Sequence, residues 1–377
     1  MTERSRPHTP FRVIRRALRS PLWHPRAMKA VTVQPGVPGS VRYGEVPEPE
    51  EGAGSVLVET VAVGICGTDV EIASGDYGWA PPGRDRLVLG HESLGRVLDP
   101  GPAIGLQTGD LVVGIVRRPD PVPCSNCAVG EWDMCRNGQY TERGIKQLDG
   151  FMSQRWRIEP DFVTKLDPSL GLLGVLLEPT TVVAKAWEMV AAMRARAFWE
   201  PRTALITGAG PIGMLAALIG VQQGLEVHVL DRVTGGLKPE LVGDLGASYH
   251  SGSVADLSFD PDIIVECTGV GPVIVESIRK VGPGGVVCLT GVGSGGRVGD
   301  LSPADLGREV VLQNNVIIGS VNANRRHFYR GARALAAADR DWLARLITRR
   351  VAPGDVNKGL ERGPDDIKVV VDFDLAT

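Results

Sequence analysis

The chain has 377 residues, 43% hydrophobic and 23% charged, with a formal net charge of −3 at pH 7. This length exceeds one ordinary hydrophobic core and predicts two domains. The small net charge gives no general attraction to nucleic acid or to an acidic membrane, so we expect neither as a partner. We also find no apolar run of the roughly 18 residues that a spanning helix needs.

Residues 1–27 differ in composition from the rest, with seven arginines and one acidic residue. They contain no apolar segment of the kind found in secretory signals, so we expect a cytoplasmic protein whose six cysteines form no disulfide framework. The segment is expected to be a disordered basic extension, with an interaction arm or a targeting segment as alternatives. Folded structure is expected to begin at Met28.

From residue 28 to about 185, short runs rich in Val and Leu alternate with Gly, Pro and Asp, which predicts a small β-barrel or sandwich. From about 186 the pattern becomes strand, glycine turn, helix, which predicts a parallel sheet covered by helices on both faces. The closing run "DIKVVVDF" reads as a strand that rejoins the first domain. We therefore expect an α/β protein with one domain over 28–185 and 335–377 and another over 186–334.

The segment "ITGAGPIG" places Gly208, Gly210 and Gly213 in G-x-G-x-x-G spacing between a strand and a helix. In a dinucleotide-binding turn these glycines allow the tight turn, the approach of the pyrophosphate, and close helix–strand packing. Asp231 ends the next strand and can accept hydrogen bonds from the adenosine ribose, which favours NAD over NADP. Arg232 could soften that preference, and a glycine turn without a ligand is the alternative.

We expect further contacts to the cofactor from the start of the helix that follows the glycine turn and from the ends of later strands. In such sheets the strand ends line the ligand crevice. Cys267 and Cys288 also lie there, and we expect them to be small packing residues. The further cofactor candidates are Pro211, Ile212, Thr268, Thr290 and Asn322.

Cys66 and His91 offer a thiolate and an imidazole, two preferred ligands of zinc, and Glu92 and Glu178 offer carboxylates. A catalytic zinc site uses about three protein ligands and keeps one position open. Taken singly, each of these residues more commonly has a structural role.

Thr68 and Asp69 follow Cys66 closely. A hydroxyl at Thr68 can contact a zinc-bound alcohol and pass its proton outward. A carboxylate at Asp69 can hold the far nitrogen of the histidine ligand and fix its tautomer. The alternative for Asp69 is an ordinary turn residue or helix N-cap.

The motifs "GICGTDVEI", "GHESLG", "LLEPTTVVAKAW" and "ITGAGPIG" together resemble the zinc-dependent medium-chain dehydrogenase/reductase family, over residues 28–377. The segments "YTERGI", "GSVNANRRHF" and "DDIKVVVDF" resemble its glucose dehydrogenase branch. The resemblance implies a GroES-like catalytic domain, a Rossmann domain and an active-site zinc between them.

By motif, the resemblance implies that Cys66 and His91 are zinc ligands, and that Glu92 and Glu178 exchange places on the metal or act through water. Thr68 matches the proton-relay hydroxyl and Asp69 the carboxylate behind the histidine.

Cys124, Cys127 and Cys135 match three of the four cysteines of the family's structural zinc lobe, C-x2-C-x2-C-x7-C. The first position falls at Pro121, which cannot ligate. Asp120 is the nearest replacement, because a carboxylate oxygen can complete a tetrahedral site. The alternatives are a different fourth ligand, a partly occupied zinc site and a lobe without metal.

The implied reaction is oxidation of a sugar or polyol hydroxyl, such as an aldose to its lactone, with zinc and NAD or NADP. Glu142 and Asn322 match polar contacts to the sugar; the alternatives are a surface carboxylate for Glu142 and a turn former for Asn322. Leu312 stands where a glucose-oxidising relative can carry a histidine, which keeps an aminocyclitol or another polyol open.

Two other readings of the same chain are a zinc-free quinone or enoyl reductase and a non-catalytic nucleotide- or metal-binding protein. The resemblance to this family, whose members commonly form homodimers or homotetramers, implies one of these two assemblies.

Overall fold

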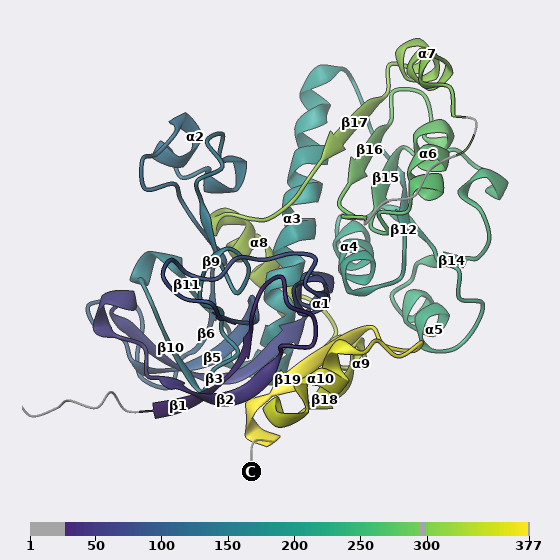
Figure 1. The fold of residues 1–377 in the computed structure, drawn as a ribbon. Helices are drawn as coiled ribbons and strands as arrows, with labels where there is room; N and C mark the ends of the chain where they lie inside the picture. Colours follow the sequence, from purple (N-terminus) through teal and green to yellow (C-terminus); the bar gives the residue numbers. More distant parts are fainter. Residues whose placement is uncertain (1–26, 294–298, 300, 376–377) are drawn as a thin grey trace, which may run out of the picture.

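The computed structural model describes residues 27–293, 299 and 301–375. The expected basic extension therefore lies, apart from Ala27, outside the described residues. The chain forms a β-rich part and a part built on a parallel sheet, with a long helix running between them (Figure 1). This arrangement confirms the predicted α/β fold with a GroES-like and a Rossmann-like domain.

The β-rich domain is built on a seven-stranded sheet in the order β11-β6-β5-β3-β19-β18, with β10 also paired to β3. Its last strands come from the end of the chain: β19 runs antiparallel to β3, with Val369 opposite Ile65. The closing run thus rejoins the first domain, as the sequence predicts. The strands of this sheet are β3 (Val56–Ile65), β5 (Glu92–Asp99), β6 (Leu111–Gly114), β10 (Arg155–Ile158), β11 (Val163–Lys165), β18 (Ile347–Val351) and β19 (Lys368–Asp372).

Two small three-stranded sheets and short helices complete this domain. Helix α1 follows β3 directly, and α2 lies in a lobe that projects from the domain (Figure 1). The strands of the small sheets are β1 (Ala27–Val33), β2 (Arg42–Pro47), β4 (Leu87–Val88), β7 (Arg117–Arg118), β8 (Thr141–Arg143) and β9 (Gln147–Leu148). The helices are α1 (Gly67–Ser74), α2 (Ser125–Ala128), α9 (Arg340–Leu346) and α10 (Val356–Leu360).

The second domain carries six parallel strands in the order β14-β13-β12-β15-β16-β17. Its central strands are short runs of apolar residues that are buried on both faces, as parallel sheets require. The strands are β12 (Thr203–Thr207), β13 (Glu226–Leu230), β14 (Ser248–His250), β15 (Ile263–Glu266), β16 (Val286–Leu289) and β17 (Val316–Gly319). The helices are α4 (Pro211–Gln222), α5 (Leu237–Asp244), α6 (Gly271–Lys280) and α7 (Pro303–Gln313).

Helices α3 (Leu177–Ala192) and α8 (Arg325–Ala336) pack against each other where the two domains meet. The expected domain limits, at 185/186 and 334/335, fall inside these two helices, so these limits stay a prediction. By length and composition, the helical stretch Pro168–Arg196 could cross a membrane, contrary to our expectation that no such run exists. Its most apolar window has a mean hydropathy of 1.3 and is 67% buried inside the protein, as in the core helix of a folded domain.

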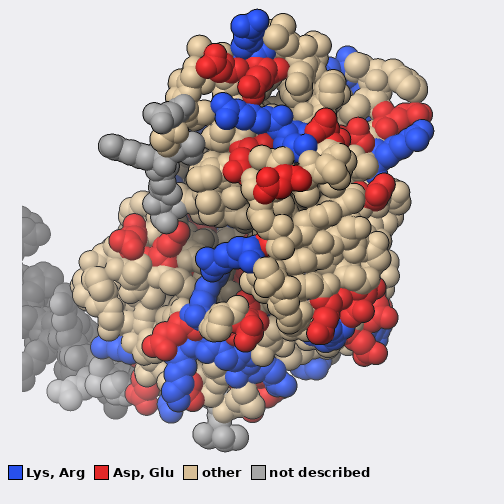
Figure 2. Space-filling view, turned by 90° about the vertical axis from the view of Figure 1, so that its right-hand side faces the viewer, with Lys and Arg blue, Asp and Glu red and all other residues tan. Residues whose placement is uncertain are grey.

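The surface shows no large area of one charge on the face drawn in Figure 2. Lysine and arginine lie interspersed with aspartate and glutamate, and most of this face belongs to other residues.

A buried ion pair ties α3 to the lobe that contains α2. Lys185 Nζ lies 2.7 Å from Asp133 Oδ2, and both side chains are almost completely buried. Lys185 also donates to the carbonyl of Val321, and Asn324 Nδ2 donates to Asp133 Oδ1 at 2.8 Å. Three segments that are far apart in the sequence are therefore held together by one aspartate and one lysine.

We expect Lys185→Met to lower the free energy of unfolding by about 3–5 kcal/mol, because it leaves the Asp133 carboxylate buried without its partner. Lys358→Met is the matched control: its pair with Asp355 is exposed to solvent and should contribute little to the free energy of unfolding. Urea unfolding of both variants measures the difference. Equal losses would show that the buried pair is not a structural link.

The same pair predicts a pH dependence. Burial by itself would raise the pKa of Asp133, but the contacts with Lys185 and Asn324 lower it below its usual value. The stabilisation should therefore be complete above the unfolded pKa of about 3.9 and be lost as the pH falls through the lower folded value.

Candidate active site

The pairing of β3 with β5 brings the predicted zinc ligands together. Gly64, near the end of β3, lies opposite Glu92, the first residue of β5. Cys66 follows β3 and caps α1, and His91 immediately precedes β5. One ligand atom from each of Cys66, His91 and Glu92 lies within 4.8 Å of the others. A Cβ at position 64 would lie 2.0 Å from Glu92 Oε2, so only glycine leaves room for this carboxylate.

Asp69 fixes the orientation of this cluster from behind. It is completely buried, and its Oδ2 accepts a hydrogen bond from the Cys66 backbone N–H at 2.9 Å. Its Oδ1 lies 3.5 Å from His91 Nδ1, which leaves Nε2 as the nitrogen available to a metal. Burial by itself would lower the pKa of His91, but the charge of Asp69 and the contact with Cys66 raise it well above its usual value. A thiol, an imidazole and a carboxylate in this arrangement fit zinc.

Lys368 is a member of this cluster that sequence reasoning missed. Its Nζ lies 2.7 and 2.5 Å from the two oxygens of Glu92 and also donates to the carbonyl of Ile65. Both side chains are almost completely buried. Glu92 therefore already has a cationic partner, and its role as a metal ligand stays a prediction. The one signal in the sequence is a lysine at the start of the otherwise apolar run "KVVV".

Glu178 lies in the first turn of α3, beside the cluster but outside the group of mutually close ligand atoms. Burial raises its pKa to about 7; the charge of Glu92 adds to this shift, and that of His91 opposes it. Thr68 is half-buried in the first turn of α1, two residues from Cys66.

The glycine turn has the geometry that a bound dinucleotide requires. Gly208 has a φ of +91°, and a Cβ at Gly213 would lie 1.7 Å from the Gly208 carbonyl oxygen. A Cβ at Gly210 would meet no atom within 4 Å, so the backbone faces open space there. Helix α4 begins at Pro211, and Ile212 follows in its first turn. The N–H groups of this turn can face an anion.

Asp231 lies against the same turn. Its Oδ2 accepts a hydrogen bond from the backbone N–H of Ala209 at 2.6 Å, and Lys238 Nζ lies 3.5 Å from the same oxygen. Its Oδ1 accepts the N–H of Val233. Arg232 follows Asp231 directly and is exposed.

Thr268 and Thr290 meet at Glu266, a completely buried carboxylate that sequence reasoning missed. Its Oε1 accepts a hydrogen bond from the Thr268 backbone N–H at 2.7 Å, and the Thr290 hydroxyl donates to its carbonyl at 2.8 Å. Glu266 thus orders the ends of β15 and β16 at the edge of the sheet where a cofactor would lie.

Glu142 and Asn322 form a polar contact between the two domains. Asn322 Nδ2 donates to Glu142 Oε1 at 2.7 Å, and Arg117 approaches the same oxygen at 3.0 Å. Glu142 is 6% exposed, so the reading as a surface carboxylate is wrong. Asn322 does adopt a left-handed conformation, with a φ of +61°. Leu312 lies on α7 and is 68% exposed, so its side chain does not line a buried pocket within one chain.

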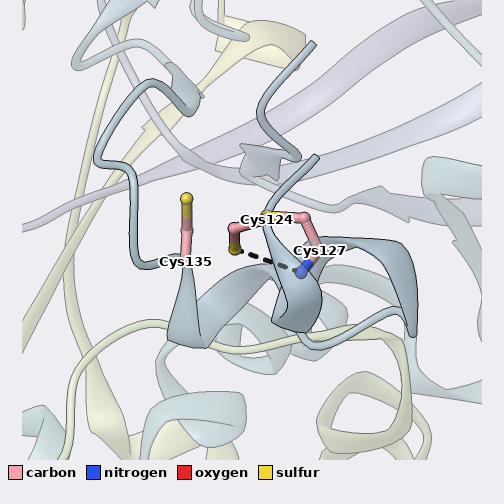
Figure 3. A group of neighbouring side chains, drawn as sticks. All are labelled: Cys124, Cys127 and Cys135. Carbon is pink, nitrogen blue, oxygen red and sulfur yellow. Dashed lines mark hydrogen bonds between the residues drawn. The ribbon is translucent and has the colours of Figure 1, made fainter. Parts of the chain in front are cut away.

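The predicted cysteine lobe brings Cys124, Cys127 and Cys135 together, with their sulfur atoms within 4.8 Å of one another (Figure 3). Cys124 Sγ accepts hydrogen bonds from two backbone N–H groups, which lower the pKa of this thiol to about 6, whereas burial raises that of Cys127 to about 11. Asp120 is not in this group; its Oδ1 accepts the N–H of Val122, and its buried Oδ2 has no hydrogen-bond partner among the described residues. Its role as fourth ligand therefore stays a prediction.

Comparison with known proteins identifies the family. Residues 52–168 match the alcohol dehydrogenase GroES-like domain, and residues 171–373 match the glucose dehydrogenase C-terminus. The chain is 38% identical over 357 residues to a glucose 1-dehydrogenase of Methanocella arvoryzae and 40% identical over 355 residues to one of Vulcanisaeta moutnovskia, with 92% of this chain and 99% of each relative covered.

Among solved structures, the fold matches the glucose dehydrogenase of Haloferax mediterranei in complex with NADP, Zn and gluconolactone. The TM-score is 0.84 and the identity 31%, and the match covers 92% of this chain and 99% of that one. The chain therefore belongs to the zinc-dependent medium-chain dehydrogenase/reductase family, in its glucose dehydrogenase branch.

Proposed function

We propose that this protein is a zinc-dependent aldose dehydrogenase that oxidises the anomeric C1 hydroxyl of a sugar such as glucose to a lactone, with NAD or NADP as the oxidant. The observation that carries the proposal is the meeting of Cys66, His91 and Glu92 in one cluster. Homology to glucose 1-dehydrogenases over 92% of the chain supports the substrate class. A metal-free reductase on this fold would have no need of such a ligand set.

Cys66 and His91 would hold the zinc ion, which as a Lewis acid lowers the pKa of the substrate hydroxyl. Asp69 keeps His91 in one orientation, and Thr68 is placed to carry the hydroxyl proton outward. Lys368 offsets the negative charge of Glu92. Because the cysteine thiolate already adds one negative charge, this lysine limits the loss of positive charge at the metal site.

The glycine turn, Asp231 and the threonines ordered by Glu266 would hold the dinucleotide. Bound NAD or NADP would accept the hydride released when the C1–H bond breaks, and Thr68 would carry the hydroxyl proton outward. Glu142 and Asn322 would orient the remaining sugar hydroxyls. A pocket that hydrogen-bonds hydroxyl groups disfavours ligands that lack them, because its polar groups are then unpaired.

The oligomeric state and location belong to the proposal. Strand β17 is an edge of its sheet, and the large apolar side chains exposed there and on α7 would be covered in a homodimer. We place the enzyme in the cytoplasm, where its six free cysteines would stay reduced. The exposed apolar residues are Val311 and Leu312 on α7, Ile317 on β17, and Val321 just after β17.

We predict that Cys66→Ser lowers kcat/KM for glucose by at least about a thousandfold, because the softer thiolate ligand is lost. Binding of the dinucleotide, followed by its fluorescence, should change little, since that site lies on the other domain. The control is Cys288→Ala, a buried cysteine outside both clusters, which should retain turnover. A parallel loss of turnover and cofactor binding in Cys66→Ser would count against the scheme.

Asp231→Ser should raise the NADP/NAD ratio of kcat/KM by about tenfold or more, because it removes a negative charge that would face a 2′-phosphate. Glu226→Ser is the matched control at the opposite end of β13, where the side chain is exposed. An unchanged ratio in Asp231→Ser would show that this carboxylate does not face the ribose.

A further inference from the structure

Three aromatic side chains gather beside Glu142, and together we call Tyr77, Trp79 and Tyr140 the aromatic platform. Tyr77 and Trp79 pack edge to face, with ring centroids 5.1 Å apart, and remain 41% and 46% exposed. Large aromatic side chains gain free energy when a partner covers them, so an exposed pair of this size is a candidate binding surface.

The platform is attached to the polar contact between the domains. The Arg117 guanidinium lies 3.7 Å from the centroid of the Tyr140 ring and also pairs with Glu142. The backbone N–H of Trp79 donates to the carbonyl of Ile145, within the turn that follows Glu142. The platform is thus fixed next to the Glu142–Asn322 contact.

The platform lies beyond the end of α1 that is opposite to Cys66. Cys66 caps the first turn of α1, whereas Tyr77 follows the end of that helix, and eight helical residues rise about 12 Å. Tyr77 and Trp79 therefore lie about one short helix away from Cys66, next to the Glu142–Asn322 contact.

We propose that the aromatic platform is an outer subsite that stacks against a second sugar ring, so that the enzyme accepts the reducing end of a disaccharide as well as a free hexose. This inference rests on the proposed function. An aldose with its C1 at the metal ligands and its hydroxyls at Glu142 and Asn322 would direct a substituent remote from C1 toward Tyr77 and Trp79.

A sugar is the occupant that suits these groups. The C–H face of a pyranose packs on an aromatic ring, and its hydroxyls need donors and acceptors at the rim. Lys146 Nζ, 4.2 Å from the Tyr140 ring centroid, supplies a charged donor there. The chemistry stays that of the proposed reaction: C1 loses a hydride to the cofactor and the hydroxyl loses its proton, while the bond between the two sugars stays intact.

The test compares glucose, maltose and cellobiose as substrates for the full-length enzyme and for Trp79→Ala and Trp79→Phe. We expect the wild-type enzyme to oxidise at least one disaccharide. Trp79→Ala should lower the disaccharide/glucose ratio of kcat/KM by about threefold to tenfold, the range of one aromatic contact, mainly through KM. Trp79→Phe should restore most of this ratio, and Phe198→Ala, which removes an exposed aromatic ring of the other domain, should not change it.

Three results would overturn the inference. These are oxidation of glucose without either disaccharide, an equal effect of Trp79→Ala on all substrates, and a change of oligomeric state in Trp79→Ala, which would assign the platform to an interface between copies. None of these three results contradicts the proposed function. The proposed function itself would be refuted if the wild-type enzyme contained bound zinc and oxidised no aldose.

Discussion

The antiparallel pairing of β3 with β5 is the constraint on which the site depends. It closes a gap of 25 residues in the chain and sets Glu92 against Gly64, where no side chain larger than hydrogen fits. Strand β19, from the end of the chain, then pairs with β3 and delivers Lys368 to the same carboxylate. The register of a sheet is strongly fixed when the side chains on one of its faces are buried. The packing of the domain core therefore determines the geometry of the cluster.

A second set of buried charges joins the two domains that carry the predicted site. The lobe with the three cysteines is held to α3 by Asp133 and Lys185, and the loop that carries Asn322 is held to the same pair. The predicted metal ligands, sugar contacts and cofactor turn come from two domains, and these buried contacts fix one domain relative to the other. The cost of burying such charges is offset only when every partner is present, which makes each of them sensitive to substitution.

Much of the fold and part of the candidate site could be predicted from the sequence, because they depend on local sequence patterns. Alternating apolar runs, the glycine spacing and the familiar motifs predict the two domains, the turn at Gly208 and the thiol–imidazole pair. Lys368 and Glu266 could not be predicted, because their partners are set by the pairing of distant strands. The long apolar stretch over α3 was overlooked because its apolar residues are interrupted by Glu178 and Lys185, and only the packing shows that it is a core helix. The platform was missed for a similar reason: nothing near Tyr77 in the chain shows that Glu142 lies beside it.

The central claim is that Cys66 and His91 hold a zinc ion, and metal stoichiometry tests it most directly. Protein purified without chelator should be compared with His91→Ala, which leaves the three cysteines of the lobe untouched, by elemental analysis of zinc per chain. The account predicts that His91→Ala contains one zinc fewer per chain than the unaltered protein, since Cys66 with only a neighbouring carboxylate makes a poor zinc site. Equal zinc content in the two proteins, with the unaltered protein active, would contradict it.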